Sequence, residues 1–272
     1  MIIDGHAHAI GEFADPKRLF PILENLKVDK VVLCPGGGDP HSEPMKPKVK
    51  ESILTTNPRI LFWSNHYLRS KTVNVGNRDL GNEYVHSLVN EFPDRILQYY
   101  WINFKDSNFL QNLKENYNRW KFKGIKLHQC VVPFENDCEE LIHVSDFASK
   151  NDLPIFIHVY NKKEAIKLVE IMRRNSTVNY TIAHMMGLEE VIKFGKDLTN
   201  VYFDTSTYYI ISKKRIKKAI SNFGADHVIM GSDSPFGYDN LQNIMSKIRS
   251  FDIPQEEKDL IMGGNIARIL KL

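Results

Sequence analysis

Short apolar runs rich in β-branched residues alternate with stretches of helical periodicity along most of this chain, and this alternation constrains its fold. The predicted strands are residues 30–34, 95–102, 124–128, 154–158, 180–184, 201–205 and 227–233, with a further strand in residues 1–8. The predicted helices are residues 16–26, 83–92, 109–120, 139–149, 162–173, 188–194 and 212–223. Alternation of this kind indicates parallel β-α units. About eight strands result, the number that closes a (β/α)8 TIM barrel.

The length of the chain agrees with one large barrel. It has 272 residues, of which 42% are hydrophobic and 25% charged, a composition typical of globular proteins. No linker or shift in composition divides it. We therefore predict a single domain over residues 1–272, slightly elaborated by an insertion at about residues 36–80 after the second strand. The apolar run at residues 60–63 belongs to that insertion.

The charge balance makes no case for a nucleic-acid partner. The formal net charge is only +3, and the densest basic cluster, residues 213–218, is either the solvated face of a helix or a phosphate-binding patch. Three cysteines with no C-x-x-C pair suit a reducing cytosol. Because we find no secretory signal and no apolar run of about 18 residues, we expect a cytoplasmic protein without a membrane partner. The oligomeric state stays open, a homo-oligomer included.

Two histidines close the first predicted strand, in the sequence Asp4-Gly5-His6-Ala7-His8. Successive side chains of a strand point to opposite faces, so His6 and His8 point the same way. Their Cα atoms would lie about 6.6 Å apart, close enough for both imidazoles to bind one metal ion. In an isolated His-x-His, one histidine can as easily be a surface residue and the other a packed core residue. The interpretation of His6 and His8 as metal ligands therefore depends on the residues at the ends of the later strands.

Several later strands also end in residues that bind metals or move protons. These residues are His128, His158, His184 and Asp233. In a parallel barrel the carboxyl ends of all strands meet at one rim, which is where the catalytic residues lie. Several imidazoles and a carboxylate on that rim would form a nitrogen and oxygen site suited to Zn²⁺ or a similar divalent ion.

The ordered set of these motifs resembles the amidohydrolase superfamily, and within it the amidohydrolase-related (amidohydrolase type 2) metal-dependent hydrolases. The resemblance covers nearly the whole chain and rests on residues 4–8 (DGHAH), 124–128 (GIKLH), 157–158 (IH), 183–187 (AHMMG), 231–236 (GSDSPF) and 263–270 (GGNIARIL). It implies one divalent ion, with zinc the first expectation and manganese the second. The implied metal ligands are His6, His8, His158 and Asp233.

The resemblance also implies catalytic roles. Asp233 would accept the proton of the attacking water, and His184 would polarise the substrate or act as an acid or base. This division supplies the nucleophile, proton carrier and electrophilic partner that hydrolysis requires. Lys126 and His128, two residues apart on one strand, share a face and are candidate substrate contacts. Arg69, in the insertion, could bind a substrate carboxylate.

Four functions remain open after this reasoning. The first is hydrolysis of a C–N or C–O bond in a small molecule, with metal-activated water as the nucleophile. The second is metal-dependent decarboxylation of an aromatic or enoic acid on the same scaffold. The third is a TatD-like phosphodiesterase, against which Lys126 and His128 stand where that family normally places a glutamate. The fourth is a barrel that only binds a ligand. Lys126 could also be a carbamylated bridge between two metal ions.

Overall fold

The structure, a computed structural model, describes residues 1–71 and 79–272. Within this part of the chain, eight parallel strands follow one another around a sheet in sequence order. They are β1 (Ile3–Ala9), β2 (Lys30–Pro35), β3 (Ile96–Trp101), β4 (Gly124–His128), β5 (Ile155–His158), β6 (Tyr180–Ile182), β7 (Val201–Asp204) and β8 (Val228–Ile229). The predicted (β/α)8 barrel is confirmed.

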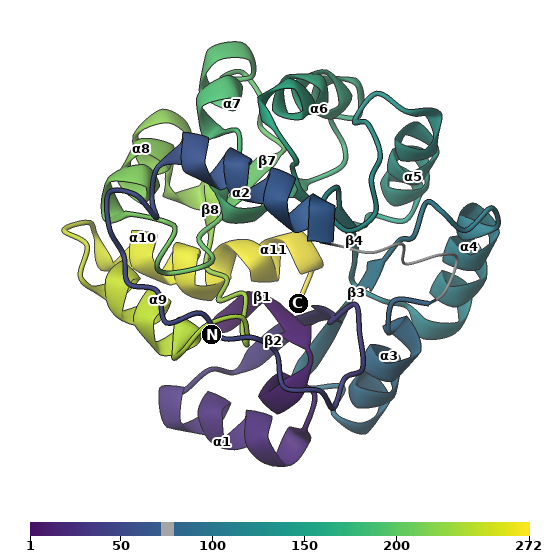
Figure 1. The fold of residues 1–272 in the computed structure, drawn as a ribbon, viewed down its shortest axis with the longest axis horizontal. Helices are drawn as coiled ribbons and strands as arrows, with labels where there is room; N and C mark the ends of the chain where they lie inside the picture. The colour runs from purple at the N-terminus through teal and green to yellow at the C-terminus, as the bar shows by residue number, and fades with distance from the viewer. Residues whose placement is uncertain (72–78) are drawn as a thin grey trace.

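Helices surround the strands (Figure 1). They are α1 (Pro16–Leu26), α2 (Pro58–Lys71), α3 (Asn82–Glu91), α4 (Phe109–Trp120), α5 (Glu139–Lys150), α6 (Lys162–Arg174), α7 (Leu188–Phe194), α8 (Lys213–Phe223), α9 (Asn240–Arg249), α10 (Gln255–Asp259) and α11 (Asn265–Leu270). Most boundaries fall within two residues of the predicted ones, because the apolar periodicity of each segment matches the face that it buries. No described helix is long and apolar enough to cross a membrane.

Apolar side chains fill both sides of the strand layer. The larger cluster packs the outer faces of the strands against the ring of helices. A smaller cluster fills the barrel interior, where Tyr99 and Phe156 are almost fully buried. Ile266 and Ile269 of α11 belong to this second cluster. Helix α11 therefore packs against the barrel interior.

Two strands are shorter than predicted. Strand β6 ends at Ile182 instead of residue 184, because residues 183–185 form a 3-10 turn in which His184 has a φ of 54°. Strand β8 is only Val228–Ile229, whereas residues 227–233 were predicted. Beyond it the chain still runs beside β1, since the N–H of Gly5 donates to the carbonyl of Met230 at 2.9 Å. The barrel therefore closes through individual backbone hydrogen bonds rather than through a full ladder.

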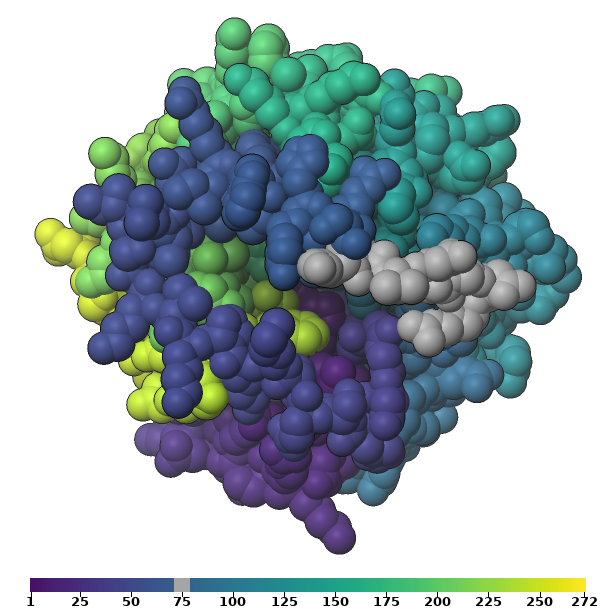
Figure 2. Space-filling model, viewed as in Figure 1, coloured from purple at the N-terminus to yellow at the C-terminus, as the bar shows by residue number. Residues whose placement is uncertain are grey.

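The connection between β2 and β3 holds the predicted insertion. Its apolar run at residues 60–63 is part of helix α2, which lies across the ring of strands in Figure 1. Figure 2 shows the insertion covering part of this face, with atoms of the N-terminal region deeper in the hollow beside it. The residues at 72–78 of this predicted insertion lie outside the described part of the chain.

Candidate metal centre

Strand β1 directs His6 and His8 to one point, as the spacing predicts, with their Nε2 atoms 3.1 Å apart. Each ring is held through its other nitrogen. Nδ1 of His8 lies 2.8 Å from the carbonyl of Pro35, and Nδ1 of His6 lies 3.0 Å from Oγ of Ser206 and 3.3 Å from a carboxylate oxygen of Asp204. A carbonyl only accepts, so Nδ1 of a neutral His8 carries the proton. The acceptors around His6 favour the same form, which leaves both Nε2 lone pairs facing each other.

Asp233 completes a triangle of donor atoms with these histidines. Its backbone N–H donates to the carbonyl of His6 at 2.7 Å, which fixes the residue beside β1. Its Oδ1 lies 3.3 Å from Nε2 of His8 and 3.6 Å from Nε2 of His6. Tetrahedral ligands at about 2.0–2.1 Å from zinc are themselves about 3.3 Å apart. The sides of the triangle lie around that value, so the donor set fits a divalent cation.

The environment gives His6 and Asp233 the protonation states that metal ligation needs. Burial, reinforced by the nearby charge of Lys126, lowers the pKa of His6 well below its ordinary value, so its imidazole is neutral at neutral pH. Burial alone would raise the pKa of Asp233, but the contacts of its carboxylate with His8, His6 and His184 outweigh burial and hold the pKa at about 2. Neutral imidazoles and an ionised carboxylate bind divalent metals without first losing protons.

His184 reaches the same site from the turn after β6. Its Nδ1 lies 2.7 Å from the carbonyl of Ser206, and its backbone N–H donates to Oδ2 of Asp204 at 3.2 Å. These two bonds to the end of β7 account for the left-handed turn that replaces the predicted strand end. Because the carbonyl accepts from Nδ1, the Nε2 of a neutral His184 is an unprotonated acceptor.

Two buried carboxylates, Asp204 and Asp4, form hydrogen bonds with residues that surround the metal centre. Asp204, at the end of β7, contacts both the His6 ring and the backbone of His184, and burial raises its pKa. Asp4, which was not predicted, accepts from the backbone N–H of Ser232 at 2.9 Å and from its hydroxyl at 2.5 Å. Burial raises the pKa of Asp4 to about 7. Its position two residues before His6 in the sequence could have predicted that Asp4 lies on the same face of the strand.

His158 and His128 lie together on the neighbouring part of the same rim. They end β5 and β4, and their rings stack with centroids 3.9 Å apart and planes 7° from parallel. Both line the cavity of the metal centre. Two clusters of the described residues bring their ligand atoms within 4.8 Å of one another: one is His6, His8 and Asp233, and the other holds His158 with His128 and Cys130. Ligation by His158 therefore stays a prediction.

Lys126 points into the barrel interior and is fully buried. Its Nζ lies 3.1 Å from Nε2 of His6 and 4.1 Å from the ring centroid of Phe156. Burial lowers the pKa of this ammonium group. The predicted closeness of Lys126 and His128 to the metal centre agrees with this placement, while their contact with substrate and the carbamylated alternative remain predictions.

The residues above open into a cavity of about 280 Å³. Five of its lining residues were missed by the sequence reasoning, namely Gly36, Leu68, Trp101, Val131 and Phe236. Of these, Trp101 gave a signal as an aromatic residue near the end of the predicted strand 95–102, and Phe236 gave one as the last residue of the motif 231–236. The indole Nε1 of Trp101 is buried and has no hydrogen-bond partner in the described part of the chain. The walls are thus mainly apolar and aromatic, and the polar groups gather at the floor.

Helix α2 forms part of the wall of this cavity. The buried Asn65 donates to the carbonyls of Val159 (3.0 Å) and Tyr160 (2.8 Å), which anchors the helix to the loop after β5. Three residues further along, Leu68 lines the cavity. Arg69 instead places its guanidinium 4.5 Å from the ring centroid of Tyr160 and is not among the lining residues. The proposed contact of Arg69 with a substrate carboxylate therefore stays a prediction.

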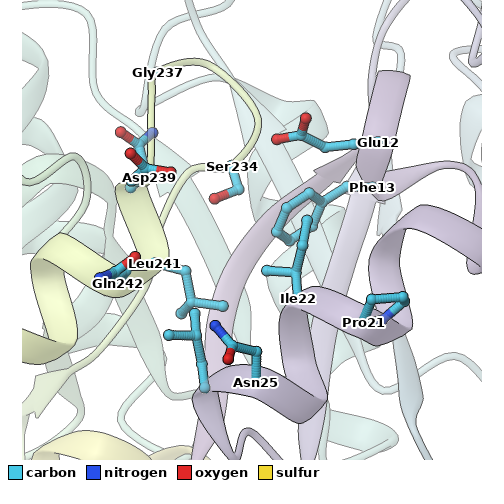
Figure 3. A pocket seen from close by; sticks show the side chains of 12 residues that line it. Glu12, Phe13, Pro21, Ile22, Asn25, Ser234, Gly237, Asp239, Leu241 and Gln242 are labelled. Atoms are coloured by element: carbon cyan, nitrogen blue, oxygen red, sulfur yellow. The ribbon is translucent and has the colours of Figure 1, made fainter.

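A second cavity, of about 340 Å³, lies between α1 and α9 (Figure 3). Figure 3 shows Glu12 and Ser234 in its upper part, with Phe13 and Ile22 nearby, and the polar Asn25 and Gln242 in its lower part. Its lining contains no histidine. The cluster of histidines therefore belongs to the first cavity alone.

Comparison with known proteins gives a family match. The family model described as amidohydrolase matches residues 69–272, which is three quarters of the chain. No curated protein matches the sequence.

Solved structures of similar fold cover almost the whole chain. A 2,6-dihydroxybenzoate decarboxylase from Rhizobium has a TM-score of 0.71 at 13% identity, covering 99% of this chain and 98% of its own. A dihydroxybenzoic acid decarboxylase from Polaromonas, with bound manganese and 2-nitroresorcinol, has a TM-score of 0.71 at 14% identity, covering 100% and 97%. A 4-oxalomesaconate hydratase from Rhodopseudomonas palustris has a TM-score of 0.64 at 14% identity, covering 100% and 96%. At these identities the likeness establishes the fold alone.

Proposed function

The chain belongs to the amidohydrolase family, and from this premise we propose that it is a divalent-metal hydrolase that cleaves a C–N or C–O bond of a small molecule. The observation that carries the proposal is the triangle of donor atoms from His6, His8 and Asp233, with sides of 3.1, 3.3 and 3.6 Å. Imidazole and carboxylate ligands of this type are those that catalytic zinc sites use.

We propose that His6, His8, His158 and Asp233 hold one divalent ion. Imidazole and carboxylate donors favour zinc, and manganese is the second choice. The manganese in the Polaromonas decarboxylase makes that second choice reasonable. When bound, the ion would supply Lewis-acid activation of water and of the substrate.

The side chains then divide the proton transfers among them. Asp233, ionised at neutral pH, accepts the proton of the attacking water and delivers it to the leaving group. His184, whose Nδ1 is fixed by the Ser206 carbonyl, presents Nε2 as an acceptor or, once protonated, as an acid. Lys126 and His128 contact the substrate from the adjacent strand, and Arg69, from the insertion, binds a substrate carboxylate.

The walls of the cavity favour a second candidate, decarboxylation of an aromatic or enoic acid. A volume of about 280 Å³ with Trp101 and Phe236 in its lining suits a small planar molecule. Lys126 supplies a cation beside His6 that could hold a carboxylate. We propose a small-molecule substrate for both reactions and place the enzyme in the cytoplasm, with the oligomeric state still open.

The first experiment is the metal content of the purified enzyme by elemental mass spectrometry. We expect about one equivalent of zinc or manganese per chain and its loss in the His6→Ala/His8→Ala double variant. The exposed His143→Ala variant, on α5, is the matched control and should keep the metal. No metal in the wild type, with unchanged stability of the double variant, would reject the metallohydrolase. About two equivalents would favour a bridging Lys126.

The second experiment separates the two reactions. Lactones, amides and small carboxylic acids are screened in water enriched in oxygen-18. Hydrolysis places the heavy oxygen in the product, whereas decarboxylation releases CO₂ without that incorporation. Product labelling by wild type, absent in Asp233→Asn, supports hydrolysis. Release of CO₂ with unlabelled product replaces it with the second candidate.

A further inference from the structure

Cys130 lies where the chain turns back after β4. The N–H groups of Val131 and Val132 both donate to the carbonyl of His128, at 3.1 and 2.9 Å, which makes this turn tight. The turn brings Sγ of Cys130 to 3.7 Å from Nδ1 of His158 at the end of β5. The cysteine side chain is fully buried, so this contact is part of the packed interior beside the metal centre.

The spacing of these groups would permit a second metal site, since ligand atoms of His128, Cys130 and His158 lie within 4.8 Å of one another. The ring geometry argues against it. The two imidazoles are almost parallel at 3.9 Å, so their in-plane lone pairs run side by side instead of converging on one ion. Nδ1 of His128 also already accepts the backbone N–H of Cys130 at 3.2 Å.

We propose that Cys130 is a positioning residue for His158. Its sulfur accepts a hydrogen bond from the Nδ1–H of His158 and so leaves the Nε2 lone pair, on the other side of the ring, for the cavity. A neutral imidazole carries one proton, and an acceptor beside one nitrogen fixes the proton there. The inference rests on the proposed role of His158 as a metal ligand.

Three other histidines of the site, His6, His8 and His184, follow the same pattern, whereas Nδ1 of His128 accepts the backbone N–H of Cys130. The Nδ1 atom of His8 lies on a backbone carbonyl, that of His184 on the carbonyl of Ser206, and that of His6 on Ser206 and Asp204. For His158 the corresponding neighbour of Nδ1 is the thiol of Cys130. The thiol thus takes the place that oxygen acceptors have at the other rings.

If Cys130 donated this hydrogen bond to His158 instead of accepting it, His158 would have the other tautomer. A thiol is also a weak donor, and an S–H that donated to Nδ1 would place the ring proton on Nε2. His158 would then present an N–H to the cavity and could not bind a metal without losing that proton. The tautomer of His158 therefore decides between the two directions.

The first test measures this tautomer in the metal-free wild-type protein. Long-range proton–nitrogen NMR spectra of protein labelled with ¹⁵N-histidine distinguish the two neutral tautomers, and the His158 signals are identified by their loss in His158→Gln. We expect the proton on Nδ1. A proton on Nε2 in the wild type would overturn the proposal, whatever the enzyme binds.

The second test compares variants of Cys130 by chelator competition with Zn²⁺. Loss of a hydrogen-bond partner of a metal ligand weakens affinity on the order of 10-fold to 100-fold, and we expect this for Cys130→Ala, with partial recovery in Cys130→Ser. Cys34→Ala removes an equally buried thiol from β2 and is the control; it should bind Zn²⁺ like the wild type. An affinity of Cys130→Ala within about twofold of the wild type would overturn the proposal.

Failure of the proposed function looks different from failure of this inference. Wild-type protein that binds no Zn²⁺ contradicts the proposed metal centre, and the tautomer of the metal-free protein then decides the role of Cys130 alone. If Cys130→Ala does not fold, the Cys130→Ser variant and the wild-type tautomer still give the answer.

Discussion

Replacing Lys126 with methionine is expected to stabilise the protein and abolish its activity. The ammonium is fully buried, and its one hydrogen-bond partner among the described residues is Nε2 of His6, at 3.1 Å. The ring of Phe156 gives a further cation–π contact. Two N–H bonds of a buried cation therefore have no acceptor, a state that an isosteric apolar side chain removes.

The magnitude follows from these contacts. Two unsatisfied buried donors cost roughly 2–6 kcal/mol, and the hydrogen bond and cation–π contact return roughly 2–4 kcal/mol. The midpoints of these ranges differ by about 1 kcal/mol, which is the expected net gain of Lys126→Met. For 272 residues the unfolding entropy is about 0.57 kcal/mol/K, so we expect Tm to rise by about 2 °C.

Lys247→Met is the matched control, because Lys247 is also buried but well satisfied. Its ammonium donates to the carbonyl of Ile211 at 2.6 Å, to the carbonyl of Tyr208 and to the carboxylate of Glu51 at 2.8 Å. The methionine there should lower Tm by about 2–5 °C, since it breaks the ion pair with the exposed Glu51 and leaves the two carbonyl acceptors unpaired. Both values come from thermal unfolding in one buffer. A decrease in Lys126→Met as large as that in Lys247→Met would refute the reasoning.

Three further predictions follow from the same structure. Asp204→Asn, which weakens the acceptor behind a metal-facing imidazole, should reduce metal affinity on the order of 10-fold to 100-fold; an unchanged affinity in chelator competition would contradict it. Burial alone would raise the pKa of Glu189, but its two hydrogen bonds from Arg215 outweigh this and set the folded pKa below the ordinary value of 4.5. The resulting stability is present above pH 4.5 and lost as pH falls through the folded pKa, so denaturant titrations should show a loss in this acidic range that Glu189→Gln lacks. Gly187→Ala should destabilise the protein by about 1–3 kcal/mol, because Gly187 has a φ of +87° and an added Cβ would lie 2.5 Å from that of Ala165; unchanged denaturant stability would rule this out.

Sequence periodicity predicted those features that depend on one segment of the chain alone. The period of two in a strand places His6 and His8 on one face wherever the strand lies, and their Nε2 atoms indeed meet at 3.1 Å. The barrel order then follows from the alternation of strands and helices. The family resemblance inferred from the motifs is confirmed by the family match. Asp233 lies beside the two histidines, and its metal ligation stays a prediction.

Sequence periodicity failed where contacts with distant segments determine the backbone conformation. Residues 180–184 look like a strand, but hydrogen bonds from His184 to Asp204 and Ser206, about twenty residues away, turn the chain after Ile182. The position of Asp233 likewise depends on its backbone hydrogen bond to His6, near the other end of the chain. Sequence periodicity does not predict such hydrogen-bond partners.

What the sequence by itself determined is the set of strands, the rim on which the histidines gather and the family. What only the tertiary structure decided is how each ring is held and what closes the cavity. The acceptor behind His6 lies 198 residues away in Asp204, and Leu68 reaches the cavity because Asn65 anchors α2 to the loop after β5. Hydrogen-bond direction and cavity walls depend on atoms brought together across the barrel, whereas strand faces depend on the backbone of each segment alone.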